Sequence, residues 1–400
     1  MAKLNSSRTR KRRLIVPLSL SFCTSLVIAE ENDSAKGFFD RAWSHATLWK
    51  SPENDSFFAL SGRLQLDSYW FSADKDDVPA GAEDNASDTR WRRFRFGFNS
   101  EFGSGYTIQL EGDFDLNNKM DNLYNRLTDA YIGYSAGKSW SVKALKQSVG
   151  YTLDGATSSK KLLTLQRNNL TNNLWATDEY FSGLHVAGTV AEKWNYRVGA
   201  FSGDDSEEIG FDSVGYLSLL SLGYDFAENL NLDDAFVRVD YVYNSKDSDD
   251  QTDDDDDYEN NATPDFRHTT TLATKWRKGA WGLRTDLSAG KGLDRQSDIW
   301  GLVLMPVYSF SEYQQVVLRY TYMDSSDDNG LRLGRYEREV VSGKGDRYNE
   351  VYMGYNLFIY GQKLKWQTGL QFTKMDDNAD DDNKGKYTGW GLTTGLRMYW

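Results

Sequence analysis

Apolar and polar residues alternate with a period of two along much of the chain. From Trp390 to Trp400, apolar residues and one threonine hold every second position, while glycine, threonine and arginine hold most of the positions between them. Similar alternation occurs in four other stretches, at 237–243, 281–287, 315–322 and 363–372. Successive side chains of a β-strand point to opposite faces of the sheet, so this period indicates strands. The chain is therefore predicted to be all-β.

The links between the predicted strands alternate between short and long. We expect about sixteen strands from Ser56 onward, the last of them ending at Trp400. Tight turns fall near Gly103–Gly105, Ala136–Lys138, Ala191–Lys193, Lys278–Ala280, Phe310–Glu312 and Tyr360–Gln362, with a slightly longer turn at Ala227–Asp233. Long polar loops fall near 73–89, 116–126, 149–175, 202–213, 245–263, 290–297, 324–345 and 375–386. This arrangement is typical of a transmembrane antiparallel β-barrel with short periplasmic turns and long external loops.

A soluble β-sandwich would also alternate, but it would not separate short and long connections in this way. In a barrel that crosses a bilayer, the polar face of each strand lines water and the apolar face meets lipid. Closure of the sheet gives every backbone donor and acceptor a partner where no water is available. The pattern therefore favours the outer-membrane barrel.

The amino-acid composition favours an all-β protein over other classes of protein. The 400 residues include 34 glycines, 5 prolines, 13 tryptophans, 24 tyrosines and 20 phenylalanines, a mixture that favours β-structure. Hydrophobic residues make up 39%, and no apolar run of about 18 residues follows the N-terminus, which excludes a bundle of membrane-spanning helices. The many large aromatics argue against disorder. A net charge of −13 argues against nucleic acid as a partner.

The N-terminus has the character of an export signal. Six basic residues precede a mainly apolar stretch from Leu14 to Ala29, and we interpret residues 1–29 as a signal peptide. A membrane anchor is the alternative, but the stretch is short for a span and is interrupted by Pro17. The lone Cys23 could be a lipoprotein site, yet Phe22 before it fits poorly, so we expect Cys23 to leave with the signal.

The expected mature chain would carry 40 basic and 59 acidic side chains, a net charge of −19, and no cysteine. Stability without disulfides is consistent with a sheet that closes on itself. Residues 30–55 fit no strand pattern and are expected to be a periplasmic N-terminal segment, either a short helix, an arm or disordered. The barrel would then span 56–400, in the outer membrane.

Several stretches resemble the phosphate-selective porin O and P family. They are Leu60–Asp67, the strand around Arg92–Arg95, Thr128–Gly133, Thr152–Ser159, Tyr216–Asp225 and Val237–Tyr241. The resemblance implies a sixteen-stranded, homotrimeric outer-membrane porin whose third long loop folds inward and narrows the channel. The chain departs from the family at Lys143–Lys146, where the family often has Gly-Gln-Phe-Lys.

A diffusion channel needs a wet lumen, and the charges facing it set its selectivity. On the inward phase of the strands we count twelve basic residues, Arg63, Arg93, Arg95, Lys143, Arg197, Arg238, Lys275, Arg284, Arg319, Lys363, Lys365 and Arg397. Eight acidic residues share that phase, Asp67, Glu111, Asp113, Asp115, Asp129, Asp240, Asp286 and Glu350. The acidic excess of the chain therefore falls in the loops, and the wall is mildly basic.

The leading interpretation is a porin for passive diffusion of small hydrophilic solutes, with a preference for anions or phosphate as one form of it. Guanidinium forks match phosphate oxygens, and we expect Lys160, Lys161 and Arg167 of the third loop to act with the wall. The candidate pore-lining residues are Arg63, Arg93, Arg95, Lys143, Lys160, Lys161, Arg167, Arg197, Arg238, Arg284 and Arg319. The alternative for each is a cross-strand ion pair that only fills the wall.

Other chemistry has little support. The acidic runs Asp204–Glu208, Asp253–Asp257 and Asp376–Asp382 are either solvated loops or carboxylates bridged by divalent cations. Three scattered histidines give no zinc spacing, and the Gly-x-Ser-x-Gly around Ser135 falls at a strand-to-strand turn rather than at a nucleophile elbow. We expect no enzyme activity, cofactor or metal. The alternative function is a surface anchor or adhesion protein that acts through its acidic loops.

Overall fold

The computed structural model describes residues 33–78, 82–103, 105–118, 122–175, 179–203, 208–211, 215–245, 266–293, 296–379 and 385–400. The expected signal peptide, residues 1–29, lies outside this set, as do Asp253–Asp257 and parts of the other two acidic runs. The chain forms two units, one up to His45 and one from Ala46 to Trp400. The first contains helix α2 (Asp33–Ser44), in which Phe39 meets the rings of Phe38 and Trp43 edge-on.

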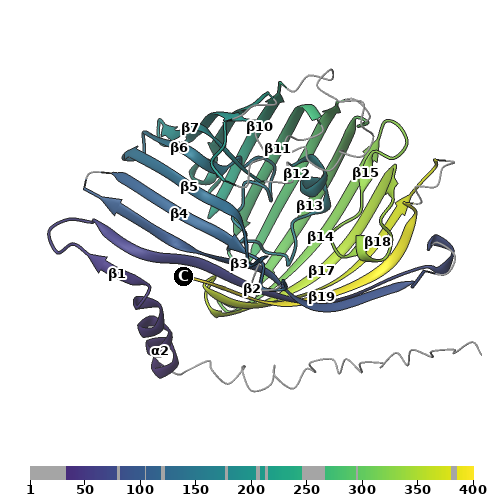
Figure 1. The fold of residues 1–400 in the computed structure, drawn as a ribbon, viewed down its shortest axis with the longest axis horizontal. Helices are drawn as coiled ribbons and strands as arrows, with labels where there is room; N and C mark the ends of the chain where they lie inside the picture. Colours follow the sequence, from purple (N-terminus) through teal and green to yellow (C-terminus); the bar gives the residue numbers. More distant parts are fainter. Residues whose placement is uncertain are drawn as a thin grey trace, which may run out of the picture. The chain divides into compact units, whose positions relative to one another are not determined.

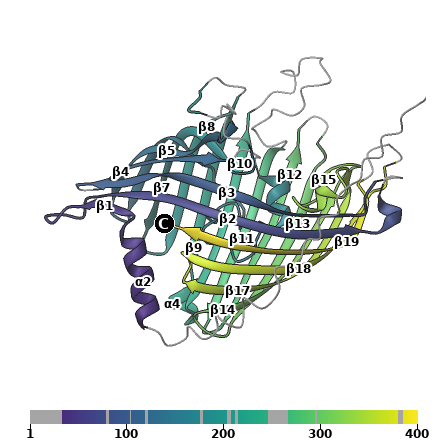
Figure 2. The same ribbon diagram turned by 60° about the horizontal axis from the view of Figure 1, so that its bottom comes forward.

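The second unit is a closed barrel of sixteen antiparallel strands, each paired with the next along the chain (Figures 1 and 2). The last strand pairs with the first over Gly389–Ala73 to Tyr399–Arg63, which closes the sheet. The first eight are β2 (Phe57–Ala73), β3 (Asn85–Phe102), β4 (Tyr106–Phe114), β5 (Tyr124–Ala136), β6 (Trp140–Ser148), β7 (Tyr180–Val190), β8 (Trp194–Ser202) and β9 (Tyr216–Asp225). The others are β10 (Asp234–Asn244), β11 (Phe266–Lys278), β12 (Trp281–Gly292), β13 (Ile299–Ser309), β14 (Gln314–Ser325), β17 (Arg347–Tyr360), β18 (Leu364–Asp376) and β19 (Tyr387–Tyr399).

The short and long connections alternate as predicted. Six tight turns and the longer turn that holds α4 (Ala227–Leu230) join the hairpins at one end of the barrel. At Gly279 and Gly361 the backbone adopts φ of 58° and 51°, a conformation that favours glycine. Among the long connections, two matter most below. We call 149–179, between β6 and β7, loop L3, and 326–346, between β14 and β17, loop L7.

Loop L7 has short elements of its own. Strands β15 (Leu331–Arg332) and β16 (Lys344–Gly345) pair with each other apart from the barrel, and the 3-10 turn η5 (Glu337–Glu339) lies between them. Elsewhere, a 3-10 turn η2 (Lys75–Asp77) follows β2, and a six-residue helix α3 (Asn169–Leu174) forms part of L3. No helix in the part of the chain that the structure describes is long and apolar enough to cross a membrane.

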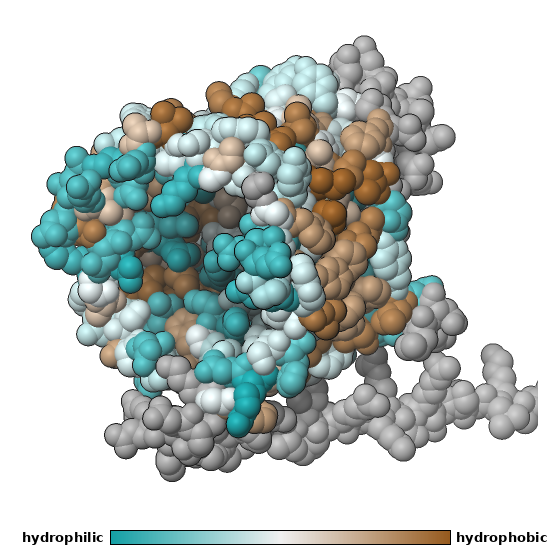
Figure 3. Space-filling model, turned by 90° about the vertical axis from the view of Figure 1, so that its left-hand side faces the viewer, coloured by the Kyte–Doolittle hydropathy of each residue, from teal (hydrophilic) through white to brown (hydrophobic). Residues whose placement is uncertain are grey.

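The two faces of the wall differ as the alternation predicted. On β14, Leu318 is 46% exposed on the outside, whereas its neighbour Arg319 is 3% exposed on the inside. Figure 3 shows hydrophobic residues over the outer wall and hydrophilic residues in and around the hollow at the end that faces the viewer. Many of the exposed aromatics lie near the strand ends, as in the interfacial girdles of membrane barrels: Trp70, Tyr106, Trp140, Trp194, Tyr216, Trp281, Trp300, Phe310 and Trp390.

One side of the lumen is apolar, which alternation alone does not predict. On β13, Val303 and Met305 point inward and are buried, although Leu304 between them faces outward. With Val317 and Met323 of β14 they belong to a cluster with residues of α3, L7, β17, β18 and β19. The expectation that inward positions are polar is therefore incomplete here, because the loops inside the barrel cover this wall and keep it dry.

The segment before the barrel contains a strand that the pattern did not reveal. Strand β1 (Thr47–Lys50) pairs with β2 at residues 57–59. Farther along the same edge of β2, the backbones of Gly62 and Trp400 exchange hydrogen bonds of 3.2 Å. Strand β1 thus continues the edge of β2 beyond the last strand, so residues 30–55 include both a helix and a strand.

Candidate functional site

Loop L3 lies inside the barrel, because side chains on both sides of the lumen bond to its backbone. On one side, Lys365 of β18 donates to the Leu162 carbonyl at 2.7 Å, and Arg319 of β14 donates to the Gln166 carbonyl at 3.2 Å. On the other side, Arg238 of β10 donates to the Thr152 carbonyl at 2.7 Å. The loop therefore crosses the lumen, as the family resemblance implied.

The roots of L3 are packed and strained. Trp175 and Tyr151 join a buried apolar cluster with inward residues of β7 to β10. Thr152 and Glu179 adopt φ of 62° and 64°, a region that costs energy for residues with a side chain. Such strain persists only where the surroundings hold it, and it concentrates at functional sites. The position of L3 is thus fixed by packing as well as by hydrogen bonds.

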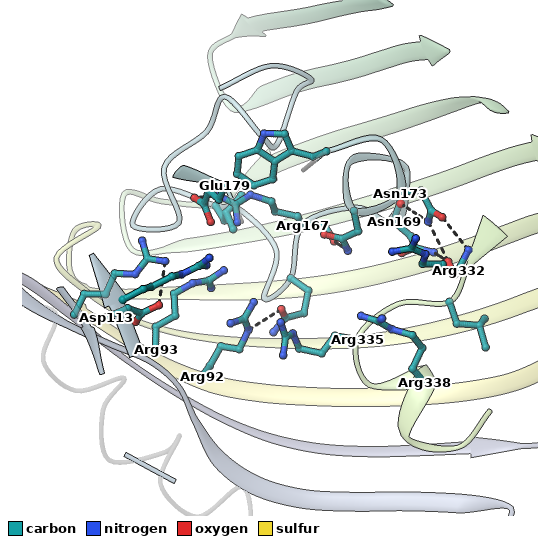
Figure 4. Close-up of a pocket in the computed structure, with 17 residues that line it drawn as sticks. Arg92, Arg93, Asp113, Arg167, Asn169, Asn173, Glu179, Arg332, Arg335 and Arg338 are labelled. Atoms are coloured by element: carbon teal, nitrogen blue, oxygen red, sulfur yellow. Dashed lines mark hydrogen bonds and ion pairs between the residues drawn. The ribbon is translucent and has the colours of Figure 1, made fainter. Parts of the chain in front are cut away.

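Loop L3, strand β3 and loop L7 together enclose a cavity of about 210 Å³, which we call the arginine cavity (Figure 4). Eight arginines line it, Arg92, Arg93, Arg95, Arg126, Arg167, Arg332, Arg335 and Arg338. Its only acidic lining residues in the described part of the chain are Asp113 and Glu179. Amides from Gln166 and α3, with Leu162, Leu333 and Trp175, complete the wall.

A β-bulge in β3 directs several of these arginines inward. Gln65 of β2 is opposite Arg93, but the next residue, Leu66, is opposite Trp91, so Arg92 is the extra residue of the bulge. The bulge shifts the phase of alternation by one residue. As a result Arg92 and Arg93 both line the cavity, although strict alternation would place one of them outside.

Loop L3 contributes Arg167 and its partners. The Arg167 guanidinium lies 3.1 Å from the Glu179 carboxylate and 4.4 Å from the centre of the Trp175 ring. Burial alone would raise the pKa of Glu179, but Arg167, Arg95 and Arg93 hold that pKa well below its usual range. Glu179 is therefore ionised, and it balances only part of the positive charge around it.

Loop L7 supplies the opposite face of the cavity. The amide of Asn173 in α3 donates to the Arg332 carbonyl at 3.0 Å and accepts from the Arg332 backbone N–H at 2.8 Å, which ties L7 to L3. Figure 4 shows Arg335 directed toward Arg92 of β3, with Arg338 farther along L7. Two loops and two strands, β3 and, through Arg126, β5, thus bring their cations together.

Comparison with known proteins agrees with this architecture. Residues 58–217 match the model of the family described as phosphate-selective porin O and P. An anion-selective porin from Comamonas acidovorans superposes with a TM-score of 0.59 at 15% identity, over 86% of this chain and 100% of that one. OmpF of Salmonella typhi, in complex with daunomycin, gives 0.58 at 12% identity, over 88% and 100%. OmpT of Vibrio cholerae, in its trimer form, gives 0.53 at 9% identity, over 86% and 99%.

This chain is an outer-membrane porin. The family match confirms the resemblance over residues 58–217, and the sixteen-stranded barrel confirms the predicted fold. No curated protein sequence matches the chain. The family and the fold are those of a channel rather than an enzyme.

Three of the predicted site residues line the arginine cavity of the porin. Arg93 and Arg95 reach it from β3, and Arg167 reaches it from L3. Arg95 bonds to the Tyr180 hydroxyl and lies 3.4 Å from Asp113. Five further lining arginines were not among the candidates: Arg92, Arg126, Arg332, Arg335 and Arg338. The run of arginines at 332, 335 and 338 was visible in the sequence, but nothing there indicated that L7 turns inward.

A second charged cluster contains two more candidates. Arg63 donates to Glu111 at 2.7 Å and to the Ser159 hydroxyl of L3 at 2.7 Å. Lys160 lies 4.0 Å from the same Glu111 carboxylate. Burial, followed by repulsion from Arg63, lowers the pKa of Lys160 to about 8. This cluster on L3, β2 and β4 adds charge to the lumen outside the arginine cavity.

The remaining candidates lie elsewhere. Arg197 and Arg238 both pair with Asp240, at 2.8 and 2.9 Å, and Arg319 pairs with Glu350 at 2.8 Å. Because these three also bond to the backbone of L3, or to Thr164 within it, they hold the loop as well as lining the wall. The others are Lys143, with its ammonium 4.2 Å from the centre of the Tyr131 ring, Arg284, which is half-buried on β12, and Lys161, which is exposed on L3.

No group of three or more histidine, cysteine, aspartate or glutamate side chains in the described part of the chain could hold a metal ion. The suggestion that divalent cations bridge the acidic runs stays a prediction, since much of those runs lies outside the described residues.

Proposed function

We propose that this porin passes small hydrophilic solutes by passive diffusion and prefers anions. The observation that carries the proposal is the arginine cavity, where eight guanidinium groups face two carboxylates at the level of L3. Rings of arginine or lysine are the usual means by which pores select anions. An anion that enters the cavity relieves repulsion among the arginines and finds several planar donors for its oxygens.

The acidic loops limit how strong this preference becomes. The chain carries a net charge of −13, while the lining of the cavity is basic, so the negative charge lies away from the narrow part. A negative vestibule slows the entry of anions at low salt. The proposal is therefore a general porin with anion preference, in which phosphate is one of the anions accepted.

The proposed assembly is a homotrimer in outer-membrane lipid. Support comes from the structural similarity to OmpT of Vibrio cholerae in its trimer form. The exposed apolar outer wall provides the surface that lipid and neighbouring copies would cover. Native mass spectrometry of the detergent-purified porin should give three times the mass of one chain, and a monomer at all concentrations would contradict this part of the proposal.

Selectivity is tested in planar bilayers. We expect the reversal potential in a KCl gradient to show that chloride permeates better than potassium, and the double substitution Arg93→Gln and Arg95→Gln to reduce that preference. A cation preference in the wild type, unaltered by the two substitutions, would defeat the proposal. Liposome swelling with small sugars tests the alternative of a surface anchor, since a barrel with a blocked lumen would give no solute flux.

A further inference from the structure

Loop L7 extends far from its own strands. It starts at β14 and ends at β17, yet Tyr336 reaches β2, with the hydrogen-bonded strands β18 and β19 between β17 and β2. The Tyr336 ring stacks on Tyr69 of β2, with ring centres 4.1 Å apart and planes 12° apart. Its hydroxyl donates to the buried carboxylate of Asp67 at 2.5 Å. The loop thus crosses part of the lumen and docks on a distant wall.

A second contact at the same place involves charge. Arg90 of β3 lies 2.5 Å from Glu339 of L7, and its guanidinium stands 5.0 Å from the centre of the Tyr69 ring and 5.3 Å from that of Tyr336. An exposed ion pair alone contributes little. Here it acts together with a buried hydrogen bond and a stacked ring pair. We call these five residues, Asp67, Tyr69, Arg90, Tyr336 and Glu339, the L7 latch.

Two further anchors hold L7 from the other side. The Glu337 carboxylate accepts from the Gly334 backbone N–H at 2.5 Å, from Gln371 at 2.7 Å and from Thr373 at 2.6 Å, both on β18. Asn173 of L3 binds the backbone of Arg332. The loop is thus anchored to β2 and β3, to β18, and to L3.

These anchors hold L7 in a position where its arginines repel the arginines of β3 and L3. Arg332, Arg335 and Arg338 line the cavity that also holds the arginines of β3 and L3. Burial, followed by repulsion from Arg335, lowers the pKa of Arg338. Without its anchors, L7 would relieve this repulsion by moving away from β3.

We propose that L7 is a second selectivity loop of this porin. Its Arg335 and Arg338 form one face of a binding site for small oxyanions, the arginines of β3 and L3 form the other, and the L7 latch holds the two faces together. This inference rests on the proposed anion preference. It adds that the preference depends on L7 and on contacts remote from the permeating ion.

The first test removes charge from L7. We expect the double substitution Arg335→Gln and Arg338→Gln to lower the chloride-to-potassium permeability ratio several-fold in planar bilayers and to weaken block of chloride current by inorganic phosphate. The matched control is Lys138→Gln with Lys278→Gln, which removes the same charge from two exposed positions at the turn end. If the wild type prefers anions and the L7 variant keeps the full preference, the inference is wrong while the proposed function stands.

The second test breaks the L7 latch. It distinguishes the effect of the position of L7 from the effect of the net charge of the lumen. Glu339→Gln removes one negative charge, so charge counting predicts a stronger anion preference. The latch predicts the opposite, because L7 and its arginines would withdraw from β3. We expect the permeability ratio to fall and the single-channel conductance to rise. A rise in the ratio would overturn the latch.

Tyr336→Phe serves as the neutral companion, since it keeps the ring and removes the hydroxyl, which donates to Asp67 and accepts from Gln166 of L3 at 3.4 Å. We expect a change in the same direction as for Glu339→Gln and at least as large, because this hydrogen bond to Asp67 is buried whereas the Arg90–Glu339 pair is partly exposed. Heat-modifiable mobility on gels confirms that each variant forms a barrel. A wild type without any anion preference would instead refute the proposed function itself, and the role of L7 with it.

Discussion

Arg92 illustrates how one residue's position depends on a local irregularity. It occupies the bulge of β3 and reaches the arginine cavity, where its guanidinium donates to Gln166 of L3 at 3.2 Å. A strictly alternating strand would have directed either Arg92 or Arg93 toward lipid, where a cation is costly.

The bulge predicts that Arg92 matters for selectivity. We expect Arg92→Gln to lower the chloride-to-potassium permeability ratio by about fivefold, the effect of losing roughly 1 kcal/mol of stabilisation of an anion near one guanidinium. Reversal potentials in a KCl gradient measure the ratio. Lys278→Gln, at an exposed turn, is the control and should leave it unchanged. An unaltered ratio in Arg92→Gln would place this side chain outside the ion path.

The lowered pKa of Lys160 predicts that the anion preference depends on pH. Burial lowers its pKa to about 8, so the side chain carries its proton below that pH and releases it as the pH rises. The lumen then loses one positive charge, and we expect the anion preference to decline between pH 7 and pH 9. Bilayer recordings at both values measure it. Lys160→Arg should flatten the dependence, because a guanidinium stays charged; an equal decline in that variant would assign the titration to another group.

At the scale of elements, the short helix α3 connects packing to pore size. Its N-terminus is capped by Asn168, whose side chain accepts from the Thr171 N–H at 2.7 Å. Leu170 and Leu174 are fully buried in a cluster with inward apolar residues of β13 and β14. This apolar contact gives L3 a firm seat in the wall, in addition to the polar bonds along its backbone.

Loss of that packing should loosen L3. We expect Leu170→Ala to reduce stability by about 2–5 kcal/mol, as large-to-small changes in a core do, and to raise single-channel conductance because L3 moves. Thermal unfolding followed by gel mobility measures the first effect, and bilayer recording the second. Leu220→Ala, on the lipid-facing side of β9 with 56% exposure, is the control for volume lost outside the lumen. Equal effects of both substitutions would deny α3 this role.

At the scale of the whole molecule, charge is separated between the loops and the lumen. Acidic runs fall in long loops, whereas arginines gather at L3 and L7 inside the barrel. The two sets act over different distances, because loop carboxylates act through water and the cavity arginines act at contact. Salt screens the first more than the second.

This separation predicts a salt-dependent effect of the acidic run Asp253–Asp257, which lies outside the described residues. We expect its replacement by asparagines to raise chloride conductance at 0.1 M KCl and to change it little at 1 M, since the screening length falls from about 10 Å to about 3 Å. Conductance across a series of KCl concentrations measures this. A change of equal size at both concentrations would show that the loop acts by blocking the pore rather than by charge.

Local patterns along the chain were sufficient to predict the barrel and its connections. Period-two alternation and turn residues act over a few neighbouring positions, so strand number, wall faces and the division into short and long links could be predicted. They also predicted that Arg93, Arg95 and Arg167 belong to the lumen, because two follow the strand phase and the third lies in the third long loop.

The contents of the lumen, in contrast, depend on contacts between segments that are far apart in the sequence. The inward Val303 and Met305 could not be recognised as lumen residues, since loops remote in sequence cover them. Arg335 and Arg338 reach the cavity because Tyr336 binds Asp67, a residue 269 positions away. Alternation along a strand carries no information about contacts of that range, so where a long loop docks, and hence how the pore selects, depends on the folded barrel.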